Sequence, residues 1–209
     1  MNAKKYAGIV SHYEACLREH GDTHLGVDWP KEADANTRYA VMLEVIKGPK
    51  PATVTLLDFG CGAAHLYQYM CRCGIGHIDY SGLDLSPRFI ELCRRKFPSL
   101  PFYCLDILER PEELPPFDYI VMNGVFTEKR ELTYGEMFDY FTRTLRATFA
   151  KARIGIAFNV MAKHVDWERD DLFHVPFDEL AELLCRELTR NFVYRNDYGL
   201  YEYTTYVYR

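Results

Sequence analysis

The sequence predicts an α/β fold: a doubly wound, mostly parallel sheet of seven strands with a C-terminal antiparallel hairpin and an N-terminal cap of two helices. Strand-like and helix-like segments alternate between residues 54 and 158, which is typical of a parallel sheet covered by helices on both faces. A glycine-containing turn joins the first strand to the helix after it, and a turn with the sequence NDYGL joins two β-rich runs near the C-terminus. These three observations determine the fold class that we expect.

The cap is expected over residues 1–50 and the main unit, a single compact body, over residues 51–209. The predicted helices cover residues 4–19, 34–47, 63–72, 86–96 and 176–187, and one more begins at residue 133. The predicted strands cover residues 54–59, 78–83, 101–105, 119–122, 154–158, 191–195 and 201–208.

Local signals support these elements in turn. The segment GDTHLGVDWPKE between the first two helices is irregular, and Trp29-Pro30 within it is a turn or lid candidate. The first strand, residues 54–59, is almost continuously apolar. Ser86-Pro87 combines an N-cap residue with a proline at the first helical position. Thr133 and Glu136 have the spacing of a capping box, so a helix should begin there.

Composition restricts the classes of protein. Hydrophobic residues make up 48% and charged residues 26%, and no apolar run approaches a membrane span or the core of a signal peptide. We therefore expect a cytoplasmic protein without membrane contact. The net charge of −5 disfavours a nucleic-acid partner, since affinity for phosphate backbones comes mostly from clustered Lys and Arg. The seven cysteines lack CxxC spacing, so we expect reduced core thiols and no metal site.

The segment LLDFGCGAA, which follows the first strand and precedes a helix, is a candidate ligand-binding loop. Gly60 allows a sharp turn, and Gly62 lets a ligand approach the backbone. A dinucleotide fingerprint would require a small residue where this chain has His65, so NAD is disfavoured. Asp58 would repel a pyrophosphate but attract the ammonium group of a methionine moiety. Asp84 ends the second strand at about the 20-residue offset of an acid that binds ribose hydroxyls. Together these residues favour S-adenosyl-L-methionine (SAM).

With these motifs, residues 53–160 resemble the class I SAM-dependent methyltransferase family. LLDFGCGAA is similar to the first family motif, with Ala64 in place of its usual third glycine. Asp84 matches the ribose-binding acid, Asp106 matches the acid that contacts the adenine amino group, and Asn123-Gly124 matches the fourth motif. The resemblance implies SAM as cofactor and a binding site that includes Asp58, Phe59, Gly60, Gly62, Asp84, Leu85, Asp106, Ile107 and Asn123.

Each assignment has an ordinary structural alternative. Asp84 could cap the following helix, Asp106 could be a turn residue, and Asn123 could satisfy loop backbone groups. The joint pattern favours a site, because the carboxyl ends of successive parallel strands meet at one crevice.

Candidates for the remaining roles come from two other regions. The segment after the fifth strand contains His174 and His164, which we rank first and second as a general base because imidazole titrates near neutral pH. Both could instead be exposed loop residues. The N-terminal helices should form the opposite wall of the pocket, with Trp29, Arg38 and Tyr39 as its candidate residues. Arg38 could pair with the SAM carboxylate, or it could be an ordinary surface arginine.

The leading functional hypothesis is a SAM-dependent methyltransferase that acts on an oxygen, or less favoured a nitrogen, of a small metabolite. The motif of planar-amine methyltransferases, Asn or Asp followed by Pro-Pro and an aromatic residue, is missing after the fourth strand. One alternative is a non-catalytic SAM-binding or S-adenosylhomocysteine-binding protein with a regulatory or partner role. Another, disfavoured by His65, is an NAD-dependent oxidoreductase. The sequence specifies no oligomeric state.

The ribose assignment can be tested directly. Replacing Asp84 by Ala should weaken cofactor binding by one to two orders of magnitude, or about 1.4–3 kcal/mol, because a charge-assisted pair of hydrogen bonds is lost. Isothermal titration with S-adenosylhomocysteine (SAH) measures this change. An affinity equal to that of the unmodified protein would remove Asp84 from the site.

Overall fold

The computed structural model describes residues 6–48 and 53–209. The first two residues of the predicted helix 4–19 and the expected boundary between residues 50 and 51 lie outside these described residues. The helices are α1 (Ala7–His20), η1 (Leu25–Val27), α2 (Glu32–Leu43), α3 (His65–Arg72), α4 (Pro87–Lys96), η2 (Pro111–Glu113), α5 (Tyr134–Lys151) and α6 (Phe177–Glu187). The strands are β1 (Val54–Phe59), β2 (Ile78–Asp84), β3 (Phe102–Cys104), β4 (Phe117–Phe126), β5 (Ala152–Ala162), β6 (His174–Val175), β7 (Phe192–Arg195) and β8 (Glu202–Tyr208).

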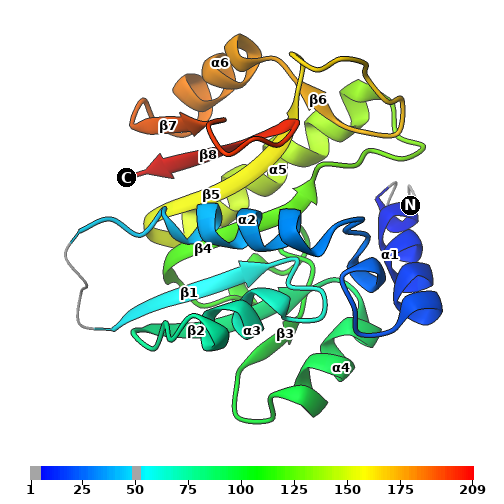
Figure 1. Cartoon of the computed structure of the whole chain (residues 1–209). Coiled ribbons are helices and arrows are strands. Elements are labelled where there is room, and N and C mark those ends of the chain that lie inside the picture. The colour runs from blue at the N-terminus through cyan, green and yellow to red at the C-terminus, as the bar shows by residue number, and fades with distance from the viewer. Residues whose placement is uncertain (1–5, 49–52) are drawn as a thin grey trace.

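The strands form one sheet in the order β3-β2-β1-β4-β5-β8-β7 (Figure 1). β1 to β5 pair in parallel, whereas β8 runs antiparallel to both β5 and β7. The predicted fold class is therefore confirmed. One detail differs: the short strand β6, which pairs with β5, makes eight strands among the described residues instead of seven. Two residues are too few to show a strand period, so the sequence pattern missed β6.

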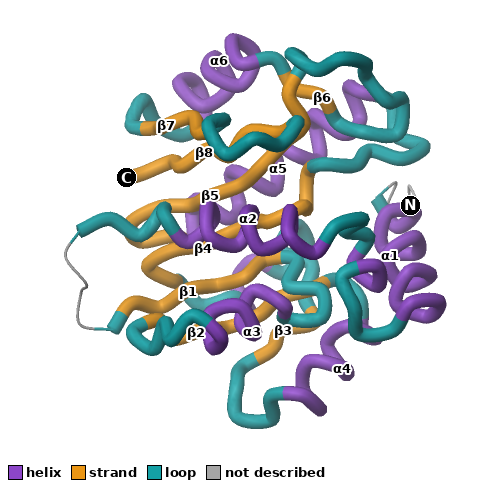
Figure 2. Tube along the Cα trace, viewed as in Figure 1, coloured by secondary structure: helices purple, strands orange, loops and turns teal. Residues whose placement is uncertain are grey.

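Two apolar clusters cover the two faces of the sheet, as the alternation of side chains along a strand requires. On β1, Leu57 and Phe59 belong to the cluster that also contains buried residues of α5 and α6. Val54 and Leu56 point the other way, into the cluster shared with α2, α3 and α4. The tube in Figure 2 shows the same arrangement, with the strands between two sets of helices. Burial on both faces explains why the central strands are nearly continuous apolar runs.

The two N-terminal helices have different relations to this sheet. α2 buries four residues against it, and the hydroxyl groups of Tyr206 and Tyr208 on β8 donate to the carbonyl oxygens of Val41 and Val45. In contrast, α1 has no fully buried residue and lies beyond the arrowhead of β1 (Figure 1). α2 is therefore part of the layer that covers the sheet, whereas α1 covers the edge at which β1 ends.

Two expectations about the chain as a whole can be compared with the structure. Within the described residues, no helix combines the length and the hydropathy of a membrane span. All seven cysteines are free thiols, but only two of them, Cys61 and Cys93, are buried. Four others are exposed, so the expectation of core thiols holds for a minority of them: Cys71, Cys73, Cys104 and Cys185.

The capping box predicted at the start of α5 is confirmed. The Thr133 hydroxyl oxygen accepts from the backbone N–H of Glu136 at 3.3 Å, and the Glu136 carboxylate accepts from the Thr133 N–H at 2.9 Å. Replacing Thr133 by Ala should lower the free energy of unfolding by about 1 kcal/mol, because a helix N–H loses its partner. Urea denaturation measures the loss. The control is Thr142→Ala in the interior of the same helix, which should cost less; equal losses would contradict a capping role.

Candidate functional site

A pocket lies at the carboxyl ends of β1, β2 and β4, the edge at which the sequence places the ligand-binding residues. The space between its walls, including the open mouth, is about 1000 Å³. Its floor comes from the sheet and the loops that follow these strands, and its cover comes from α1 and the segment around η1. The predicted cofactor-binding residues that line it are Asp58, Phe59, Gly60, Gly62, Asp84, Leu85 and Asn123.

The glycine loop after β1 is held tightly against its surroundings. The N–H groups of Gly60 and Cys61 both donate to the Leu83 carbonyl oxygen, at 2.7 and 2.9 Å. Gly60 has a φ of +74°, and a Cβ atom there would lie 2.6 Å from a methyl group of Val125. Ala64, which replaces the third glycine of the family motif, also has a positive φ of 57°. The loop thus keeps the backbone shape that glycines favour, although one of them is absent.

Asp84 connects the first loop to the second. One carboxylate oxygen accepts from the Gly62 N–H at 2.9 Å, and the other accepts from the Ser86 N–H at 2.8 Å. The side chain that caps α4 is that of Ser86, which accepts from the N–H of Phe89. Asp84 therefore organises the loops as well as lining the pocket, and its oxygens retain lone pairs that can accept from two neighbouring hydroxyl groups of a ligand.

Asp58 lies on the floor of the pocket with only 3% of its surface exposed. Burial raises the pKa of its carboxyl group to about 7, and the nearby charge of Asp84 adds to this increase. The hydroxyl of Tyr80 donates to Asp58 at 2.8 Å and acts in the opposite direction. A cation bound beside Asp58 would favour the ionised form, so this part of the pocket is suited to a positively charged group.

The sequence predicts that the N-terminal helices form the opposite wall of the pocket, and α1 does line it, but the side chains of α1 were not among the predicted candidates. Ile9, Val10 and Tyr13 of α1, together with Tyr6 immediately before the helix, line the pocket. Their spacing of three, four and seven residues places them on one face of a helix, and this stripe was the available signal. Trp29 and Tyr39 also line the pocket, as the sequence predicts for the opposite wall.

Polar contacts anchor α1 to the loops that surround the pocket. The Tyr6 hydroxyl donates to Asp106 at 2.6 Å, and the Ser86 hydroxyl donates to Glu14 at 2.6 Å. Asp106 is thus placed directly behind a lining residue but does not line the pocket itself, and Ile107 lies in the core cluster under α5. The roles predicted for these two residues in adenine binding stay predictions.

The structure does not bring the two predicted bases to the pocket. His174 is buried on β6, where its Nδ1 atom is 2.6 Å from the Ala162 carbonyl oxygen and its Nε2 atom accepts from the Arg169 N–H at 3.4 Å. His164 is exposed and stacks on Phe177 with ring centroids 5.9 Å apart. Neither residue lines the pocket, because the loop after β5 packs toward α6. Their assignment as bases therefore loses its geometric basis.

Arg38 is also placed differently from the prediction. Its guanidinium group forms an ion pair with Glu202, with an N–O distance of 2.7 Å, and is not part of the pocket lining. His65 does line the pocket, and its Nε2 atom is 2.8 Å from a carboxylate oxygen of Asp22. Burial lowers the pKa of His65, although the contact with Asp22 opposes this shift.

Taken together, the geometry suits a ligand with a cationic group and a pair of hydroxyl groups. The cation would lie beside Asp58, and the hydroxyl groups would lie beside Asp84. The surrounding aromatic and aliphatic side chains would exclude water from the space between them.

Comparisons with known proteins agree with this geometry. Residues 57–152 match the family described as a methyltransferase domain. The chain is 28% identical over 170 residues to a putative methyltransferase of Mycobacterium tuberculosis, Rv1506c, a match that covers 79% of this chain and 98% of the relative.

Solved structures are similar over nearly the whole fold. Magnesium protoporphyrin IX methyltransferase from Synechocystis PCC 6803 with bound SAH has a TM-score of 0.68 at 10% identity, covering 99% of this chain and 100% of that one. A SAM-dependent methyltransferase from Leishmania major has a TM-score of 0.66 at 15% identity, covering 98% of this chain and 83% of that one. At these identities the likeness concerns the fold.

The close approach of Val125 to Gly60 gives a test of the loop that needs no ligand. Replacing Gly60 by Ala should lower the free energy of unfolding by about 2–4 kcal/mol, because it adds backbone strain at positive φ and a steric overlap with Val125. The double variant Gly60→Ala/Val125→Ala should lose less than the sum of the single losses, since the overlap is gone while the strain remains. Urea denaturation of all three variants measures this, and strictly additive losses would show that the Cβ atom finds space.

Proposed function

We propose that this chain is a class I SAM-dependent methyltransferase, which binds SAM in the pocket under α1 and transfers the methyl group to a small molecule; the match to a methyltransferase domain and the fold support this. The observation that carries the proposal is the pair of carboxylates at the ends of β1 and β2. Asp58 and Asp84 both line the pocket, and the Gly62 N–H bonds directly to Asp84. Such a pair matches the ammonium group and the ribose hydroxyls of SAM.

When bound, SAM supplies an electrophilic methyl group on a positively charged sulfur atom. Displacement from that sulfur is in line with the attacking atom, so the protein's tasks are to orient both molecules and to keep water out. Asp84 would hold the ribose and Asp58 the ammonium group. The apolar side chains Ile9, Val10 and Val27 would exclude water from above, since they line the cover of the pocket.

The position of the histidines bears on the acceptor atom. A hydroxyl acceptor needs a base, whereas a neutral amine can attack without one. Among the described lining residues the histidine is His65, which is held by Asp22, and both His164 and His174 lie elsewhere. This arrangement favours nitrogen over the oxygen that the sequence preferred, and both remain within the proposal.

Other parts of the proposal concern partners and location. The pocket under α1 supports a small metabolite as acceptor, and the net charge of −5 supports the exclusion of nucleic acid. A cytoplasmic location stays a prediction.

Incubation with SAM labelled on its methyl group, together with a metabolite extract, tests the proposal. Transfer of label to a small molecule, detected by mass spectrometry and lost in Asp84→Ala, is the expected result. Repeated failure to transfer label despite tight SAH binding would instead support a non-catalytic binder. Thermal stabilisation by NADH but not by SAH would overturn the assignment of the cofactor.

The pKa of Asp58 predicts how cofactor affinity depends on pH. Because this carboxyl group ionises near pH 7 in the empty pocket and the ionised form attracts the ammonium group, SAH should bind about tenfold more weakly at pH 6 than at pH 8. Isothermal titration at both values measures the ratio. The variant Asp58→Asn should lose the dependence, and 5′-methylthioadenosine, which lacks the ammonium group, should not show it. An equal slope for SAH in the Asn variant would contradict the placement.

A further inference from the structure

A buried ion pair lies directly outside the pocket wall. Glu202 on β8 has 1% of its side chain exposed, and Arg38 on α2 has 12%. The Nε and Nη2 atoms of Arg38 donate to the same carboxylate oxygen of Glu202, at 2.8 and 2.7 Å. The two residues are 164 positions apart in the sequence, so the pair joins the C-terminal hairpin to the N-terminal helix that covers the sheet.

The other oxygen of Glu202 continues the network toward the pocket. It accepts from the side-chain amide nitrogen of Asn159 at 2.8 Å, and the amide oxygen of Asn159 accepts from the backbone N–H of Gly124 at 2.8 Å. The carboxylate can only accept and the N–H can only donate, so the orientation of the Asn159 amide is fixed. Gly124 has a φ of +79° and lines the pocket. The network therefore ends on a pocket turn that two buried side chains bond: Asn159 accepts from the Gly124 N–H, and the Thr127 hydroxyl donates to the Gly124 carbonyl oxygen at 3.1 Å.

Arg38 also contacts Trp29, a residue of the pocket wall. Its guanidinium carbon lies 4.2 Å from the centre of the Trp29 ring, and Trp29 lines the pocket. The same indole lies against Gly124, where a Cβ atom would be only 2.7 Å from a ring carbon of Trp29. Trp29 is thus confined between a cation that Glu202 holds and a turn that Asn159 holds. Glu202 is therefore connected to both of these neighbours of Trp29, to Arg38 directly and to the Gly124 turn through Asn159.

We propose that Arg38 and Glu202 are positioning residues that fix Trp29 and the Gly124 turn, and thereby the wall of the pocket beside Asn123. The statement that this wall faces the methyl acceptor rests on the proposed function. The statement that Arg38 and Glu202 position the wall is independent of it. A buried ion pair is often replaceable by apolar residues without loss of stability. Apolar residues in place of the pair would not supply the planar guanidinium group that lies over Trp29. If the pair positions the wall, such a replacement should therefore change the surroundings of the indole even where stability is unchanged.

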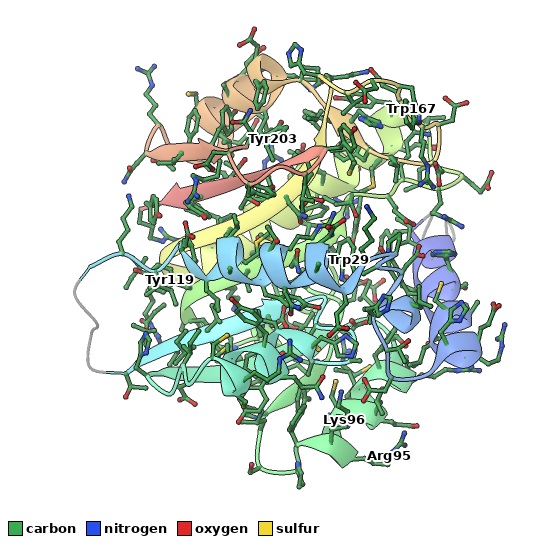
Figure 3. The ribbon with its side chains drawn as sticks, viewed as in Figure 1. Trp29, Arg95, Lys96, Tyr119, Trp167 and Tyr203 are labelled. Carbon is green, nitrogen blue, oxygen red and sulfur yellow. The ribbon has the colours of Figure 1, made fainter. Side chains whose placement is uncertain are left out.

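The two tryptophans of the chain make the proposal directly measurable. Trp167 is 72% exposed on the loop after β5, far from Trp29 in the view of Figure 3. In a Trp167→Phe background, emission that is excited at wavelengths beyond the absorption of the sixteen tyrosines reports on Trp29 alone. Arg38→Gln and Glu202→Gln should each shift this emission to longer wavelength and increase its quenching by acrylamide, because the indole gains freedom and contact with water. Arg38→Lys, which keeps the charge but not the flat guanidinium, should shift it less.

A double variant separates positioning from stability. Arg38→Met with Glu202→Gln leaves no unpaired charge in the interior, so its thermal midpoint should stay close to that of the Trp167→Phe parent. Its Trp29 emission should nevertheless shift as in the single variants, since the cation over the ring is gone. The matched control is Arg195→Gln. Arg195 forms an ion pair with Glu44, the residue that follows α2, and none of its hydrogen-bond or ion-pair partners among the described residues lines the pocket. The emission of this control variant should equal that of the parent.

The outcomes are decisive in both directions. Unchanged Trp29 emission and quenching in the folded double variant would overturn the proposal and leave the pair a purely structural contact. A shift in Arg195→Gln as large as in Arg38→Gln would also overturn it, because the effect would then be general. These measurements use neither cofactor nor acceptor. Failure to find methyl transfer would therefore leave the positioning result intact, and the converse also holds.

Discussion

Two backbone hydrogen bonds hold the first loop to the second strand, and the pocket depends on them. The N–H groups of Gly60 and Cys61 share the carbonyl oxygen of Leu83. The next residue of β2, Asp84, then accepts from the N–H of Gly62. The chain reversal after β1 is therefore built on the end of β2. Asp58 before the reversal and Asp84 beside it consequently line the same space, although they belong to different strands.

Three buried or half-buried carboxylates near this space are stabilised in different ways, since a bare charge in the interior is costly. Glu202 has a full counter-charge in Arg38. Asp84 has two backbone N–H donors. Among the described residues, the Tyr80 hydroxyl is the one hydrogen-bond donor to Asp58, and burial raises the pKa of Asp58 to about 7. It is therefore the carboxylate of the three that gains most from a cationic ligand.

The cover and the floor of the pocket differ in how they are held. α2 is tied to β8 by buried tyrosine hydroxyls and by the Arg38 ion pair, so it belongs to the rigid layer over the sheet. α1 is held through polar contacts such as those of Tyr6 and Glu14, and its apolar stripe faces the pocket. A ligand in the pocket would therefore complete the burial of α1, whereas α2 is buried without one. The hydrogen bonds that join Arg38, Glu202, Asn159 and Gly124 belong to the sheet and to this layer over it, and not to the cover.

The sequence by itself determined the order of the elements, the glycine loop and the set of polar residues at the carboxyl edge of the sheet. These follow from local signals, such as the Ser86 cap and the strand period, and from the rule that parallel strands end at one edge. The tertiary structure alone decided which other side chains reach that edge. It directed His174 away from the pocket and gave Arg38 a partner 164 positions along the chain. The physical reason is that loop direction and the partners of buried charges depend on long-range packing, which no local pattern encodes.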